Sequence, residues 1–205
     1  MRKYIYIVFF TIAFFATAAG VFLTSDYFAR KWESERILKA TLKDSDGNPW
    51  QISQLKNKIG IVYFGYTSCP DACPTALNDL AIALDTMGEN RRNFQPIFIS
   101  VDPERDTPEV IKEYVAHFDK TILGLTSSAS DLKAFSFNFG ATYSLQKKDR
   151  DDKDYIVNHT AGFFMVTATG DKLSLPLRDN PEELQKTILK LRKRILGLPV
   201  VHPHE

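Results

Sequence analysis

The chain has 205 residues, of which 44% are hydrophobic, and its 26 lysines and arginines nearly balance its 25 aspartates and glutamates. A formal net charge of +1 excludes the broad excess of positive charge typical of nucleic-acid-binding domains, so no nucleic-acid partner is expected. Setting aside an apolar N-terminal segment leaves about 180 residues, enough to bury the core of one ordinary domain without disulfides.

The N-terminus is expected to cross a membrane. Arg2 and Lys3 precede an uncharged run over residues 4–24, which matches the roughly 20 residues that span a bilayer. The positive-inside bias keeps these two cations in the cytoplasm and exports the chain that follows. The alternative is a signal peptide cleaved after the A-x-A pattern at 16–18. Apolar residues continue beyond that site, so we favour an uncleaved anchor, and either case makes the domain extracytoplasmic.

The chain is expected to have four parts: an anchor or signal peptide over 1–24, a connector over 25–36, a folded domain over 37–198 and a tail over 199–205. Within the domain, β-branched and aromatic runs alternate with helical patterns and turn residues. The expected elements are an edge strand over 37–43, a strand over 59–64, a helix ending near Gly88, a strand over 96–101, a helix capped by Thr107, a strand over 121–125, a helix capped at Ser130 and ended by Gly140, strands over 142–146 and 155–158, a hairpin of 162–168 and 172–175, and a last helix from Asn180.

The only two cysteines, Cys69 and Cys73, lie between the strand over 59–64 and the helix that follows it. Pro74 suits the first position of that helix, because its missing N–H costs nothing there. The position close to a helix N-terminus predicts that Cys73 favours the thiolate form. With the thiols after the first core strand, the order of elements predicts a thioredoxin-like α/β fold, in which helices flank a central mixed sheet.

His159 stands at the mouth of a second strong strand and is the third candidate site residue. Two thiolates and one imidazole make a soft donor set that suits copper. The tail histidines His202 and His204 flank a proline near the chain end, which is a weak metal signal, and we leave them out of the site.

Several segments together resemble the Sco/SenC family of copper chaperones. They are Asp46-Gly47-Asn48, the block Tyr63-Phe64-Gly65-Tyr66-Thr67-Ser68-Cys69-Pro70-Asp71-Ala72-Cys73-Pro74, the run from Ser100 to Glu109, Gly124-Leu125-Thr126 and Val157-Asn158-His159. The resemblance implies a thioredoxin-like fold and Cys69, Cys73 and His159 as ligands of Cu(I), Cu(II) or both. It also implies a partner, the CuA-bearing subunit of cytochrome c oxidase, and a place on the periplasmic side of the inner membrane, held there by the N-terminal helix.

The chain departs from the family pattern at two positions. Ser68 stands where the family often has histidine, and Asn158 stands where it typically has aspartate. The second change removes a negative charge next to the expected histidine ligand.

Two other functions remain open. The first is a thiol-disulfide oxidoreductase that reduces the cysteines of an acceptor, a role compatible with copper delivery. Against it as the sole role, thioredoxin-type enzymes use a C-x2-C spacing and a proline facing the thiols, whereas this chain has C-x3-C and no proline over 156–162. The second is a structural disulfide, although closing so short a loop gains little chain entropy.

Asp102, Arg105 and Asp106 form a charged cluster after the strand over 96–101, on the side of the sheet where this fold places its site. They are either a turn held by local contacts or a surface that contacts a partner or supports the site. The sequence does not separate these two interpretations.

Overall fold

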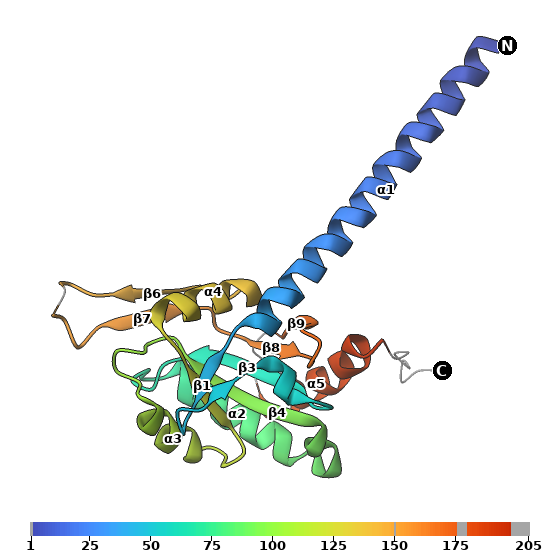
Figure 1. Cartoon of the computed structure of the whole chain (residues 1–205). Helices are drawn as coiled ribbons and strands as arrows, with labels where there is room; N and C mark the ends of the chain where they lie inside the picture. The colour runs from blue at the N-terminus through green and yellow to red at the C-terminus, as the bar shows by residue number, and fades with distance from the viewer. Residues whose placement is uncertain (1, 150, 176–179, 198–205) are drawn as a thin grey trace.

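The computed structural model describes residues 2–149, 151–175 and 180–197. From residue 59 onward, the described α-helices and strands follow the predicted order (Figure 1). In chain order they are α1 (Arg2–Lys39), β1 (Leu42–Asp44), β2 (Pro49–Trp50), η1 (Ile52–Leu55), β3 (Ile59–Gly65), α2 (Ala72–Asp85), η2 (Gly88–Asn93), β4 (Phe94–Ser100), α3 (Pro108–Ala116), β5 (Leu123–Thr126), α4 (Ala129–Phe139), β6 (Tyr143–Gln146), β7 (Ile156–His159), β8 (Phe163–Val166), β9 (Lys172–Leu175) and α5 (Pro181–Ile195).

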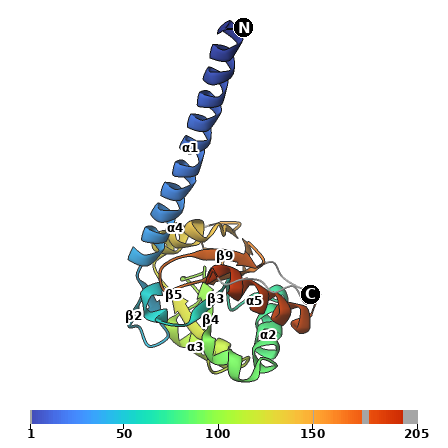
Figure 2. The ribbon, with the colours of Figure 1, turned by 90° about the vertical axis from the view of Figure 1, so that its right-hand side faces the viewer.

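The sheet is mixed, as predicted, with the strand order β2-β1-β5-β4-β3-β8-β9. Strands β3, β4 and β5 run parallel, while β8 pairs antiparallel with β3 on its other side. Every residue of β3 is buried, which is typical of a central strand covered on both faces. Helices α2, α3 and α5 lie on one face of the sheet, and α4 lies on the other beside the end of α1 (Figures 1 and 2). The predicted thioredoxin-like fold is therefore confirmed.

The hairpin of β6 and β7 projects from this body (Figure 1). In the described part of the chain its two strands pair with each other and with no strand of the main sheet. The hairpin must therefore be held on the domain by side chains and by its continuation into β8.

The end of α1 is part of the domain. The prediction of an edge strand over 37–43 is wrong: the helix continues to Lys39, and β1 pairs on both sides, with β2 and β5. Ile37 is fully buried in the core, which explains why the helix continues into the domain. Segment 25–36, predicted as a connector, is helical throughout.

By length and composition alone, α1 from Phe10 to Lys39 could cross a membrane. Its described apolar side chains, Phe14 and Phe22 among them, are mostly exposed. Near the domain, Glu33 pairs with Lys172 at 3.4 Å. Gly170 has φ +83° and lies close to Ser34: a Cβ added at residue 170 would be 2.8 Å from the carbonyl oxygen of Ser34. The last turns of α1 thus pack on the core through Ile37 and contact the β8–β9 turn and the start of β9 through Ser34 and Glu33.

The structure also differs from the prediction in where two helices begin or end. The helix after the thiols ends at Asp85 and not near Gly88, and its first residue is Ala72, so that Pro74 is its third. Helix α4 is capped by Ser128 instead of Ser130, because the Ser128 hydroxyl accepts the N–H of Asp131 at 3.2 Å. A side-chain cap decides only the start of α4, because Asp71, the residue before α2, makes no side-chain cap hydrogen bond.

Candidate metal centre

The two thiols stand on the turn between β3 and α2. Cys73 is the second residue of α2 and is fully buried, whereas Cys69 is partly exposed on the turn before it, and both are free thiols. Gly65 ends β3 directly beneath Cys73, and a Cβ there would lie 2.8 Å from the Cys73 sulfur. A glycine at the end of the strand therefore lets the thiol pack against the sheet.

His159 is brought to the thiols by the β6–β7 hairpin. It is the last residue of β7, opposite Tyr143 of β6. Its Nε2 lies 3.5 Å from the Cys73 sulfur, and its Nδ1 lies 3.2 Å from the carbonyl oxygen of Thr160. With the proton on Nδ1, the ring donates to that carbonyl and presents the Nε2 lone pair to the sulfur atoms.

The three ligand atoms predicted from the sequence meet at one place. The sulfur atoms of Cys69 and Cys73 and the imidazole nitrogen of His159 all lie within 4.8 Å of one another. Burial lowers the pKa of His159, so the imidazole stays neutral and free to bind a metal. Two sulfurs and one neutral imidazole are donors that suit copper, and their spacing fits a single ion.

The two thiols differ in acidity, and in the opposite sense to the prediction. Burial raises the pKa of Cys73 far above the ordinary thiol value despite its place at the helix N-terminus. Cys69 is also partly buried, which raises its pKa, but hydrogen bonds from the backbone N–H groups of Asp71 and Cys73 and from the side chains of Cys73 and Tyr66 together outweigh that effect and lower its pKa. The N–H of Cys73 lies 3.4 Å from the Cys69 sulfur. The free N–H groups of the helix start thus stabilise a thiolate on the residue in front of the helix.

Two tyrosines from the end of β3 and the residue after it pack against the histidine ring. The ring centroids of Tyr63 and Tyr66 lie 5.9 Å and 6.0 Å from that of His159, both edge to face. Burial raises the pKa of both phenols, so they remain neutral. In the sequence, only the position of these tyrosines just before the cysteine turn indicated a place near the site. A buried strand explains aromatic residues at such positions equally well.

The family model described as SCO1/SenC matches residues 39–191. The chain belongs to the SCO1/SenC family. It is 34% identical over 146 residues to the SCO2-like protein of Rickettsia felis, an alignment that covers 71% of each chain.

Solved SCO1/SenC structures share the fold. The crystal structure of Arabidopsis thaliana ScoI with copper bound has a TM-score of 0.69 and 32% identity, covering 76% of this chain and 96% of that one. Yeast Sco1 with copper bound has a TM-score of 0.68 and 29% identity, covering 80% of this chain and 89% of that one. Both of those proteins therefore hold copper on the same fold.

The departures from the SCO1/SenC pattern at Ser68 and Asn158 both lie on the surface. Ser68 is exposed on the turn beside Cys69. Asn158 is exposed opposite Ser144 on the hairpin, and because adjacent residues of a strand point to opposite faces, its side chain points away from the face that carries His159. The substitution therefore removes a charge from the outside of the hairpin and not from between the three ligand atoms.

Proposed function

We propose that the chain binds one copper ion through Cys69, Cys73 and His159 and delivers it to the CuA site during cytochrome c oxidase assembly. The observation that carries the proposal is the meeting of these three ligand atoms within 4.8 Å of one another. Copper in the relatives from Arabidopsis thaliana and yeast supports the choice of metal.

The arrangement suits transfer as well as binding. Soft thiolate ligands favour Cu(I), and the imidazole adds a donor that Cu(II) also accepts. Cys69 is partly exposed, so the thiolates of an acceptor can approach the metal from the side of this residue. Copper then passes by exchange of one sulfur ligand for another, without release into solution.

We further propose that α1 tethers the domain on the periplasmic side of the inner membrane. A relative from Bacillus anthracis, with a TM-score of 0.60 and 26% identity, is described as a lipoprotein of the family, which supports a membrane location. The continuity of α1 into the core supports an uncleaved anchor, because cleavage at 16–18 would cut within this helix. The domain boundaries 37–198 and the tail 199–205 remain predictions, and residues 198–205 lie outside the described part of the chain.

The test is an anaerobic titration of the full chain in detergent with Cu(I) and then Cu(II), in competition with a chelator. We expect the wild-type chain to bind one equivalent of copper tightly. Loss of a residue that merely orients a metal ligand costs about 10- to 100-fold in affinity, and His159→Ala removes a ligand itself. It should therefore weaken Cu(II) binding by at least that factor. The matched control is His117→Ala, which removes an exposed histidine at the C-terminal end of α3.

A second control replaces both tail histidines, His202→Ala and His204→Ala. It distinguishes copper bound at the proposed site from copper bound adventitiously at the C-terminus. The assignment is wrong if copper stoichiometry follows the tail histidines, or if His159→Ala and His117→Ala bind both ions as wild type does.

One observation also favours thiol-disulfide exchange, the second candidate function. Cys69 is accessible and Cys73 is buried, which is the arrangement of an attacking thiol and a resolving thiol. Such a pair could reduce the cysteines of an acceptor before copper is loaded.

Alkylation of the reduced, metal-free chain tests this asymmetry. The thiolate is the nucleophile, so a lowered pKa means that Cys69 reacts at lower pH than a free model thiol does, while Cys73 stays protonated and shielded. We expect iodoacetamide to modify Cys69 first, with a rate that reaches its plateau below the pH at which N-acetylcysteine does. Mass spectrometry of the peptides would contradict this if Cys73 carried the first label.

A further inference from the structure

Two carboxylates of the charged turn 102–106, those of Asp102 and Asp106, are buried, whereas Glu104 is exposed. Asp102 and Asp106 are 0% and 1% exposed, at the end of β4. A surface that recognises a partner cannot consist of carboxylates out of contact with solvent. The contacts of these residues lead instead to the two halves of the metal centre, the thiol turn and the histidine hairpin.

Asp106 holds the thiol half. Its carboxylate accepts the backbone N–H of Thr67 at 2.9 Å and the Thr67 hydroxyl at 2.6 Å, and it also accepts the hydroxyl of Ser100 at 2.5 Å. Thr67 lies on the turn just before Cys69. The thiol turn is thereby fixed to the end of β4 by a fully paired buried carboxylate.

Arg105 holds the histidine half. Its Nη1 donates to the carbonyl oxygens of Lys153, at 3.2 Å, and Tyr155, at 2.9 Å. Its guanidinium also lies over the Tyr155 ring, 3.7 Å from the centroid. Residues 153–155 lead directly into β7, which ends in His159.

Asp102 closes the set of contacts. Its carboxylate accepts Nε of Arg105 and the hydroxyl of Tyr155, each at 2.5 Å. The other side of Arg105 faces the thiol turn, with its Cζ 5.6 Å from the ring centroid of Tyr66, and Tyr66 packs against His159. The guanidinium thus lies between the segment that carries the thiols and the segment that carries the histidine.

An isolated two-stranded hairpin is marginally stable at best. We propose that Arg105 is a positioning residue that, with Asp102 and Tyr155, latches the β6–β7 hairpin to the body of the domain and so holds His159 over the two thiols. This inference rests on the proposed function in taking the same three residues as copper ligands.

The latch has a different consequence for each oxidation state of copper. Cu(I) is held chiefly by the two thiolates, which Asp106 fixes independently of Arg105. Cu(II) depends more on the imidazole, so a loosened hairpin should weaken Cu(II) binding and leave Cu(I) binding close to wild type. A residue that only stabilised the fold would weaken both.

The test variant is Arg105→Lys. Lysine keeps a positive charge beside the buried Asp102, which avoids the cost of an orphaned carboxylate. A compact ammonium cannot pair with that carboxylate, reach two carbonyl oxygens and stack on a ring at the same time.

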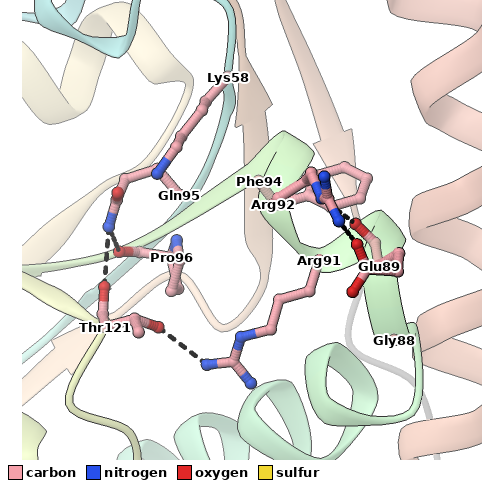
Figure 3. A pocket seen from close by; sticks show the side chains of 9 residues that line it. All are labelled: Lys58, Gly88, Glu89, Arg91, Arg92, Phe94, Gln95, Pro96 and Thr121. Atoms are coloured by element: carbon pink, nitrogen blue, oxygen red, sulfur yellow. Dashed lines mark hydrogen bonds and ion pairs between the residues drawn. The ribbon is translucent and has the colours of Figure 1, made fainter.

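The matched control is Arg91→Lys, at the opposite end of the sheet. Arg91 likewise pairs with an aspartate, Asp119. It also donates to the hydroxyl of Thr121 at 2.9 Å (Figure 3). It precedes β4, whereas the turn 102–106 follows β4, so the two sites lie at opposite ends of the same strand.

Two measurements on the full chain in detergent decide the matter. Hydrogen–deuterium exchange of the metal-free protein should become faster across β6 and β7 in Arg105→Lys and stay unchanged there in Arg91→Lys. Competition titration should show about a 10- to 100-fold weaker Cu(II) affinity in Arg105→Lys alone, as for other residues that orient metal ligands. The Cu(II) charge-transfer spectrum should shift in the same variant.

Unchanged exchange in the hairpin together with unchanged Cu(II) affinity would overturn the latch. An equal loss of Cu(I) and Cu(II) affinity would also overturn it, since it would indicate general destabilisation. If the wild-type chain binds no copper, the proposed function fails, and hydrogen exchange in the hairpin still decides whether Arg105 holds it.

Discussion

Cys69→Ser is expected to abolish tight Cu(I) binding. The serine hydroxyl is a hard, neutral donor, whereas Cu(I) selects thiolates. The remaining thiol, Cys73, is buried with a raised pKa, so it would have to lose its proton without a second thiolate sharing the metal. We expect the affinity to fall by more than the roughly 10- to 100-fold that the loss of an outer-shell partner costs.

The control for this variant is Ser68→Ala, at the exposed residue just before Cys69. It alters the same turn without removing a sulfur atom, so its Cu(I) affinity should match that of wild type in the same chelator competition. If Cys69→Ser keeps the wild-type affinity, Cys69 is not a ligand, and the assignment of the site to Cys69, Cys73 and His159 must be abandoned.

Phe139→Ala is expected to lower the free energy of unfolding by about 3–5 kcal/mol. Phe139 is 3% exposed and belongs to an aromatic cluster between α4 and the sheet. Its ring centroid lies 5.0 Å from that of Phe135, 5.6 Å from that of Phe64 and 5.8 Å from that of Phe164. Truncation leaves a cavity among the neighbouring rings, and it removes two edge-to-face contacts and one tilted contact at once.

Phe137→Ala, on the same helix, is the matched control. Phe137 is 71% exposed, so its truncation should change the free energy of unfolding by no more than about 0.5 kcal/mol. Urea unfolding followed by circular dichroism measures both variants. Similar losses in the two variants would mean that burial of Phe139 is not what stabilises α4 against the sheet.

The sequence by itself determined the family, the order of the elements from residue 59 onward and the three ligand candidates. The hydroxyl of Thr107 accepts the N–H of Val110, the side chain of Asn180 accepts that of Glu183, and Gly140 adopts φ 79°, as their positions at helix ends predict. The cysteine block and the Val-Asn-His segment carried the site because each is a specific local pattern. Signals of this kind depend on residues within a few positions of one another, so a single sequence shows them directly.

Only the tertiary structure decided the features that depend on contacts between distant segments. Burial of Cys73 against Gly65 outweighs the helix N-terminus, so the more acidic thiol is Cys69. Ile37 finds a place in the core, so a helix replaces the expected strand. From the sequence, the turn 102–106 was either a local turn or a surface that contacts a partner or supports the site. The burial of Asp102 and Asp106, and the contacts of the turn with the thiol turn and the histidine hairpin, favour support of the site. Desolvation and packing of this kind arise only when the chain has folded, which is why no local pattern encodes them.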